Sequence, residues 1–171
     1  MEQVKWFDRK FNFTQQENIF PSIIERLAGT PIRLQYKLTT VAEAVLTARL
    51  GNAWSIKENV GHLADLETLW QGRFDDIRNG LPELRATDLN NTRTTMANHN
   101  DTPLPALLQA FSMLRQQTLD LIKDIDTATV FKYALHPRLK TPMRTMDHFL
   151  FVAEHDDHHL ASISKLLKAF L

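Results

Sequence analysis

The chain has 171 residues, and its 20 basic and 20 acidic side chains give a formal net charge of zero. This balance argues against a nucleic-acid-binding protein, which would carry a basic surface, and no apolar stretch is long enough to span a membrane. Because cysteine is absent, disulfides, thiolate ligands and cysteine nucleophiles are excluded, so a transition-metal site must use His, Asp or Glu. The N-terminal residues lack the apolar region of a signal peptide, which predicts a cytoplasmic protein.

Two helices are predicted at the start of the chain. Residues 20–28 are expected to form a short helical segment that ends at Gly29. Thr30-Pro31 then has the pattern of an N-cap followed by proline at the first helical position. Apolar residues at steps of three and four predict a helix from there to about Leu46.

A capping box marks the start of the next predicted helix. Ser55 and Glu58 have the spacing at which each side chain caps the other residue's backbone N–H, and the apolar period continues to about Arg78. Residues 83–101 are polar and rich in Asn, Thr and Asp, so they are predicted to form an irregular surface loop. Its length makes this loop a candidate rim of a pocket.

Two more long helices are predicted in the second half of the chain, each opened by a Thr-Pro pair. They cover residues 102–123 and 141–169, with a short turn near residues 126–133 and a loop at residues 136–140 between them. No segment shows the sustained alternation of a strand. Four amphipathic helices of this length predict an all-α four-helix bundle. The long link between the second and third helices leaves room for a crossover connection, so simple up-down-up-down topology and a crossover topology both stay open.

Three histidines lie close together in the last predicted helix. His155 and His159 are four residues apart, so they lie one turn apart on one face, the spacing at which a helix offers two imidazoles to one metal ion. His158 is rotated by about 100° from His159, and the apolar stripe of this helix favours His155 with His159. A pair made by His155 and His158 is also stereochemically allowed.

His62, in the second predicted helix, is the candidate third ligand. Glu58, one turn before it, is assigned first to the capping box and second to an outer-shell contact with His62. Asp65, one turn after it, is a weaker outer-shell candidate. Three neutral imidazoles leave a divalent metal with an open position, as catalytic sites do. Imidazole suits zinc, nickel and iron, and the metal would activate a bound water or thiolate by lowering its pKa.

Other charged groups are interpreted as solvated. Asp156 and Asp157 are expected to point towards solvent from the last helix. His136, Arg138 and Arg144 gather near the start of that helix, where an anion would be attracted, but solvation at the surface is the preferred interpretation. A competing interpretation of the metal candidates is that they are ordinary core histidines, each hydrogen-bonded to a neighbour.

Three motifs carry a resemblance to a known family. They are WSIKENVGHLADLE at residues 54–67, HPRLKTPM at residues 136–143 and FVAEHDDHHL at residues 151–160. Together they resemble the DinB-like superfamily, a group of metalloenzymes that includes DinB and YfiT-type proteins. The resemblance implies a single four-helix bundle domain over residues 1–171, often dimeric, with one long crossover. It also implies a divalent-metal site made by His62, His155 and His159.

The function expected from these observations is metal-dependent enzyme chemistry on a small-molecule substrate. Some relatives in the family are thiol-dependent transferases or isomerases, so a thiol-dependent transferase or a hydrolase is expected, with zinc or nickel as the metal and iron as a further candidate. One alternative is a stress-response module that binds a metal or small ligand without turnover. Another is a purely structural helical dimer. His148 and His158 have no assigned role, although His148 lies two turns before His155 and would line the same cavity.

Overall fold

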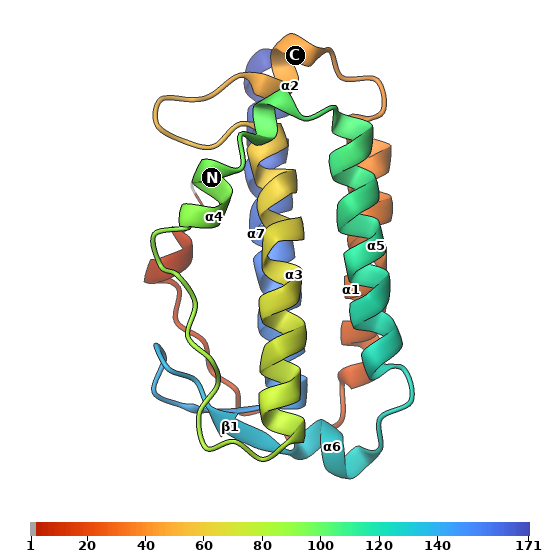
Figure 1. The fold of residues 1–171 in the computed structure, drawn as a ribbon, viewed down its shortest axis with the longest axis vertical. Helices are drawn as coiled ribbons and strands as arrows, with labels where there is room; N and C mark the ends of the chain where they lie inside the picture. The colour runs from red at the N-terminus through yellow and green to blue at the C-terminus, as the bar shows by residue number, and fades with distance from the viewer. Residues whose placement is uncertain (1–2) are drawn as a thin grey trace.

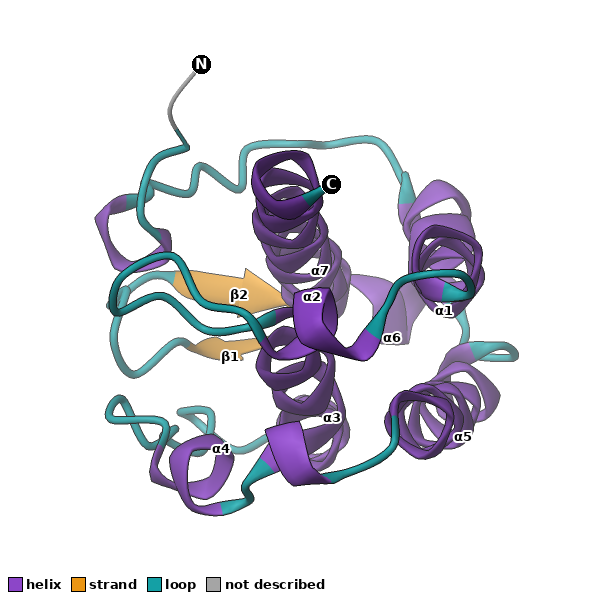
Figure 2. Cartoon of the chain, turned by 90° about the horizontal axis from the view of Figure 1, so that it is seen from above, coloured by secondary structure: helices purple, strands orange, loops and turns teal. Residues whose placement is uncertain are grey.

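The computed structural model describes residues 3–171, in which four long helices form a bundle (Figure 1). These helices are α1 (Phe20–Leu38), α3 (Ile56–Arg78), α5 (Leu104–Ile122) and α7 (Thr145–Phe170). Both α1 and α3 pack against α5 and against α7, so α1 and α3 occupy opposite corners of the bundle (Figure 2). The predicted all-α four-helix bundle is confirmed.

The four long helices do not simply alternate in direction along the chain. In Figure 1, α1 and α7 run upwards, whereas the adjacent helices α3 and α5 both run downwards. The connection from the end of α3 must therefore return along the whole bundle, which confirms the long crossover. It is more regular than predicted, because it contains a short helix α4 (Thr92–Met96) and a 3-10 turn η2 (His99–Asp101).

Short elements lie at the two ends of the bundle and along its side. The helices α2 (Glu43–Thr47) and α6 (Thr127–Phe131) and the strands β1 (Tyr133–Leu135) and β2 (Pro142–Arg144) lie at the ends, and the 3-10 turn η1 (Trp6–Asp8) lies at the side (Figure 1). The strands pair in an antiparallel ladder. Neither strand was predicted, since three residues are too few to show alternation. The last helix consequently begins at Thr145, not at Thr141-Pro142, because the proline belongs to β2.

The predicted break at Gly29 and Thr30-Pro31 is wrong, because α1 continues through all three residues. Proline inside a helix removes the N–H that would bind the carbonyl four residues earlier, which here is that of Leu27. Nη1 of Arg115, on α5, donates to this carbonyl at 3.1 Å instead. A neighbouring helix thus satisfies the group that the proline leaves free. The helix ends at Leu38, and the residues predicted to extend it form the separate helix α2.

The capping box that opens α3 is confirmed. Ser55 Oγ accepts from the backbone N–H of Glu58 at 3.2 Å, and the Glu58 carboxylate accepts from the backbone N–H of Ser55 at 2.8 Å. The box satisfies backbone N–H groups that have no partner within the first turn of α3.

Two apolar clusters fill the bundle. One surrounds Phe74 and Phe149 near the hairpin end, and the other surrounds Val60 and Phe111 near the opposite end. Along α7 the first cluster extends to Ala153 and the second resumes at Leu160. The polar residues of α7 between them form a middle layer, where the candidate site lies. Over residues 3–171, no helix combines the length and apolarity needed to cross a membrane.

Candidate metal centre

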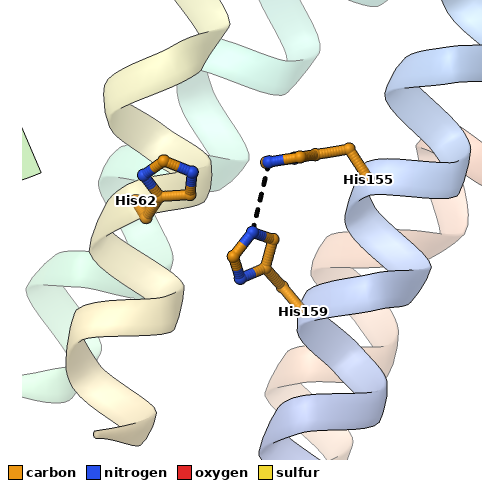
Figure 3. A group of neighbouring side chains, drawn as sticks. All are labelled: His62, His155 and His159. Atoms are coloured by element: carbon orange, nitrogen blue, oxygen red, sulfur yellow. Dashed lines mark hydrogen bonds between the residues drawn. The ribbon is translucent and has the colours of Figure 1, made fainter. Parts of the chain in front are cut away.

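Helices α3 and α7 bring the three predicted histidines together. One nitrogen from each of His62, His155 and His159 lies within 4.8 Å of the others, and all three side chains are buried. Figure 3 shows the ring of His62 on α3 facing the two rings on α7. The four-residue spacing on α7 therefore places both rings on the side of that helix that faces α3, as expected from helical geometry.

Asn59 fixes the orientation and the tautomer of His159. Its amide nitrogen donates to the carbonyls of Ser55 at 2.7 Å and Trp54 at 3.3 Å, so its amide oxygen must face the histidine. That oxygen lies 2.8 Å from His159 Nδ1. Because an amide oxygen only accepts, Nδ1 carries the proton and Nε2 keeps its lone pair.

Thr94 does the same for His62. Its hydroxyl donates to the carboxylate of Asp65 at 2.8 Å, and a hydroxyl has one proton to give. At 2.9 Å from His62 Nδ1, the hydroxyl oxygen therefore accepts from this nitrogen, which leaves the lone pair on Nε2. Asp65 thus acts on His62 through Thr94. Glu58 is instead bound to Arg49 and to the cap of α3.

Thr94 is a residue that the sequence analysis missed. It lies 32 residues beyond His62, in the crossover segment that was predicted to be irregular. No spacing rule connects a residue of α3 with a residue of a distant short helix. The long polar connection itself was the one available signal, since it marked this segment as a candidate pocket rim.

His155 completes the cluster with one nitrogen unpaired. Its Nε2 lies 3.2 Å from Nε2 of His159, whereas its Nδ1 is buried and has no hydrogen-bond partner among residues 3–171. Two imidazole nitrogens that face each other beside a third ring form a donor set suited to a divalent cation. The residues present therefore fit the metal ion that the sequence predicted.

Burial lowers the pKa of all three imidazoles. The pKa of His62 falls to about 4, and burial together with neighbouring imidazoles holds the pKa values of His155 and His159 well below the usual value. The three rings are therefore neutral near pH 7. Neutral imidazole is the form that binds metal ions, so no proton has to be displaced.

A cavity of about 490 Å³ opens beside the cluster. Its wall includes aromatic and basic side chains from distant parts of the chain, namely Trp6, Trp54, Trp70, Arg73, His136, Arg138, Phe151 and His158. A cavity of this size accepts a small molecule. His136 and Arg138 were expected to be solvated at the surface, but His136 is buried and both line the cavity.

The two histidines without an assigned role have different surroundings. His158 lines the cavity, and its Nδ1 lies 2.8 Å from the side-chain nitrogen of Gln3. His148 was expected to line the same cavity but is fully buried away from it. Its Nε2 lies 3.0 Å from the carbonyl oxygen of Trp70.

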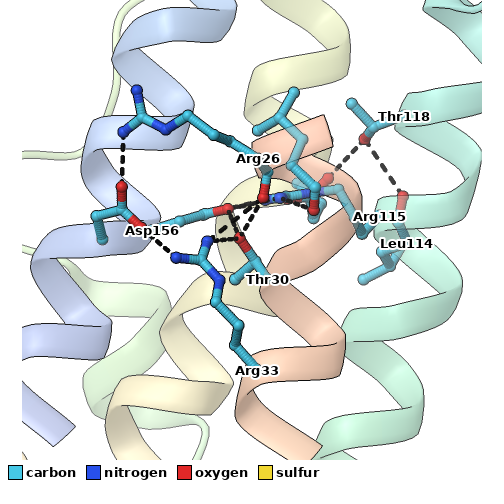
Figure 4. A network of polar contacts seen from close by, with 10 residues as sticks. Arg26, Thr30, Arg33, Leu114, Arg115, Thr118 and Asp156 are labelled. Atoms are coloured by element: carbon cyan, nitrogen blue, oxygen red, sulfur yellow. Dashed lines mark hydrogen bonds and ion pairs between the residues drawn. The ribbon is translucent and has the colours of Figure 1, made fainter. Parts of the chain in front are cut away.

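A second buried polar cluster lies among the four long helices, and Figure 4 shows it. Arg115 donates five hydrogen bonds, which go to the carboxylates of Glu67 and Asp156 and to the carbonyl of Leu27. Although burial alone would lower the pKa of Arg115, the two carboxylates raise it. The expectation that Asp156 faces solvent is wrong, because this ion-pair network buries it completely. Asp156 and His155 are adjacent, so their side chains leave α7 about 100° apart, the first into this network and the second into the histidine cluster.

The comparisons with known proteins agree with this architecture. The model of the DinB superfamily matches residues 26–163. YfiT from Bacillus subtilis, described as a probable metal-dependent hydrolase with an unusual four-helix bundle topology, has a similar structure, with a TM-score of 0.82 at 17% sequence identity. The match covers 94% of this chain and 93% of YfiT. No curated protein sequence matches significantly. Since the family model covers most of the chain, this protein belongs to the DinB superfamily.

Proposed function

We propose that this protein is a metal-dependent enzyme acting on a small molecule, with His62, His155 and His159 as the ligands of a divalent metal. One observation carries the proposal: three neutral imidazoles converge within 4.8 Å on the wall of a 490 Å³ cavity. A metal held by three imidazoles keeps an open position and lowers the pKa of the group bound there.

The surrounding residues have defined tasks in this proposal. Asn59 and Thr94 keep the protons of His159 and His62 on Nδ1, so that both Nε2 lone pairs are directed to the metal. The rings of Trp54 and Trp6 pack against the histidines, with centroid separations of 4.6 Å to His62 and 4.9 Å to His155. These rings exclude water from the ligands and give the cavity an apolar wall against which a substrate can pack.

The reaction is proposed to be hydrolysis or thiol-dependent transfer. The description of YfiT as a probable metal-dependent hydrolase supports the first. The alternative of a binding module without turnover predicts a metal with no accessible pocket, and the cavity beside the histidines counts against it. An assay with ester, amide and alkyl-halide substrates, each with and without a low-molecular-weight thiol, separates the two reactions. Turnover that requires the thiol identifies the transferase, and turnover in its absence identifies the hydrolase.

Metal content is the primary test. Purified protein is expected to contain zinc or nickel, with iron as the third candidate. His62→Ala, His155→Ala and His159→Ala are each expected to lose it. His158→Ala is the matched control, because this residue is next to His159 on α7 and lines the cavity but faces Gln3 and not the other histidines' ligand nitrogens. Unchanged metal content in all three ligand variants would contradict the proposal, and loss in His158→Ala would favour a pair formed with His155.

Several points stay predictions from the sequence. They are the cytoplasmic location, the homodimer, the single domain over residues 1–171 and the use of a low-molecular-weight thiol. Gel filtration with light scattering tests the homodimer directly.

A further inference from the structure

Arg73 is a buried cation that pairs with no carboxylate among residues 3–171. It lies on the wall of the cavity and is 1% exposed. Its Nε donates to the carbonyl of Arg85, but its Nη2 has no hydrogen-bond partner within the described chain. The nearby carboxylate of Asp76 is bound by the side chain of Arg85, at 2.9 and 2.6 Å. A buried guanidinium that lacks a partner is costly, so its retention calls for a ligand.

His136 presents a second unused donor to the same place. Its Nδ1 accepts from the backbone N–H groups of Arg138 at 3.2 Å and Leu139 at 3.1 Å. Backbone N–H groups can only donate, so Nδ1 is unprotonated and the ring proton is on Nε2. This Nε2 lies 3.3 Å from Nη1 of Arg73. Two donors therefore face each other there, and no hydrogen bond joins them.

Arg138 adds a third donor. It lines the cavity, and its Nη2 is buried without a partner among residues 3–171. It lies close enough to Arg73 for its charge to lower the pKa of that guanidinium, which burial and this charge together bring to about 10. Among the residues of the 3–171 range that line the cavity, the single carboxylate is that of Asp88, and it accepts from the backbone N–H groups of Asn90 and Thr92. The described part of the chain thus gathers donors here and leaves Nη2 of Arg73 and Nη2 of Arg138 without an acceptor.

We propose that Arg73, His136 and Arg138 bind an anionic group of the substrate, either a carboxylate or a phosphate. Two guanidinium groups and an imidazole N–H suit such a group, because its oxygens accept several hydrogen bonds at once. As a statement about the substrate, this inference rests on the proposed function. As a statement about anion binding, it stands on the three side chains alone.

The fold also sets the distance between this anion site and the histidine cluster. Arg73 follows His62 by eleven residues, about three turns, so both lie on one face of α3 with their Cα atoms roughly 16 Å apart. The rings of Trp70 and Phe151 line the cavity between them, and Trp70 stands 5.6 Å from His155, centroid to centroid. The substrate is therefore elongated, with its reacting group at the histidines, an apolar middle and an anionic end.

The test uses the full-length protein, zinc-loaded and metal-free, titrated with inorganic phosphate and separately with acetate. Nuclear magnetic resonance follows the backbone amides of Arg138 and Leu139 and the side-chain Nε–H of Arg73, with chloride at matched ionic strength as the reference. Saturable shifts are expected in both forms of the protein. The probe that binds more tightly identifies the anionic group.

Variants connect these shifts to the proposed residues. Arg138→Gln is expected to weaken binding by at least about tenfold, because it removes a charged hydrogen-bond donor. Arg73→Gln is expected to have a larger effect; if it does not fold, Arg138→Gln decides alone. Arg78→Gln is the matched control, because this arginine is exposed at the end of α3 and outside the cavity. Its affinity should equal that of the wild type.

Two results would overturn the anion site. They are shifts that do not saturate beyond the effect of chloride, and equal affinity in Arg138→Gln and wild type. Metal content is measured on the same samples to keep the two proposals apart. Anion binding by a wild-type protein that takes up neither zinc, nickel nor iron would contradict the metal site and still support the anion site. Zinc uptake without anion binding would do the reverse.

Discussion

Two polar clusters lie in the middle layer of the bundle, and they differ in how completely they are paired. In the cluster among α1, α3, α5 and α7, the five hydrogen bonds of Arg115 equal the number of N–H groups that a guanidinium carries. In the other, the histidines of α3 and α7 line a cavity and leave Nδ1 of His155 unpaired among the described residues. A fully paired buried network has nothing left to bind. Incomplete pairing on a cavity wall indicates a place for a ligand.

The largest effect is expected from breaking the paired network. Arg115→Leu leaves the carboxylates of Glu67 and Asp156 buried without a cation, which should lower the free energy of unfolding by about 3–5 kcal/mol. Urea denaturation measures this. Replacing all three charged residues by leucine should recover much of the loss, because no uncompensated charge remains. A loss under about 1 kcal/mol in the single variant would show that the network does not hold the bundle together.

His148 tests whether an unpaired buried nitrogen alone marks a ligand site, because its Nδ1 also lacks a partner among the described residues. We expect His148→Phe to keep its metal. Burial lowers the pKa of His148 to about 3, so between this value and its ordinary pKa the unfolded chain binds more protons than the folded one. Stability therefore rises with pH across that window and falls as the protein is acidified.

The measurement compares metal-free wild type with His148→Phe. Between pH 7 and pH 5 the wild type should lose roughly 2 kcal/mol more of its free energy of unfolding than the variant does. Parallel pH profiles for the two proteins would rule out this role of His148. Loss of metal from the variant would place His148 in the metal site. It would also contradict the rule that an unpaired buried nitrogen marks a ligand site only where it lines the cavity.

Thr94 tests how far the histidine cluster depends on its surroundings. Thr94→Val removes the acceptor of His62 Nδ1 while keeping the shape of the side chain. Loss of such an outer-shell contact should weaken metal binding by at least about tenfold, which competition with a chromophoric chelator can measure. Thr95→Val is the control, because this neighbouring threonine is exposed and bonds only within its own turn. Equal affinities in the two variants would refute the role of Thr94.

The smallest effect is expected at the solvent edge of the paired network. Asp157 binds Arg26 at 2.6 Å and Arg33 at 2.7 Å. All three side chains are more than a third exposed to solvent. Asp157→Asn should therefore cost less than about 1 kcal/mol of unfolding free energy. The adjacent Asp156, fully buried, should be far more sensitive to the same change. Similar losses at both positions would remove the distinction between the buried network and its exposed edge.

The features predicted correctly from the sequence depend on local geometry. The capping box at Ser55 needs only four consecutive residues, and the facing of His155 and His159 needs only the helical period. His62 was predicted as the third ligand because it lies on a second amphipathic helix of the bundle. The resemblance to the DinB superfamily added the crossover, which the long polar connection also suggested.

The features that were missed depend on contacts between distant segments. Three Thr-Pro pairs have the same local pattern, but only the pair at Thr102 comes directly before a long helix. Pro31 is tolerated inside α1 because Arg115, on α5, donates to the carbonyl of Leu27, which the proline leaves without a partner. Asp156 is buried because the same arginine lies beside it. Thr94 reaches His62 across the crossover. None of these contacts is encoded in residue spacing along one element.

The aromatic wall of the cavity has a practical consequence. The chain has three tryptophans, and all of them, Trp6, Trp54 and Trp70, line this cavity. Each indole lies within 5.6 Å of His62 or His155, centroid to centroid. The tryptophan fluorescence of the protein, when excited selectively, therefore comes entirely from the neighbourhood of the candidate site. Arrival of a quenching ion such as Ni²⁺, or of an organic ligand, can be followed in real time without a label or an engineered reporter.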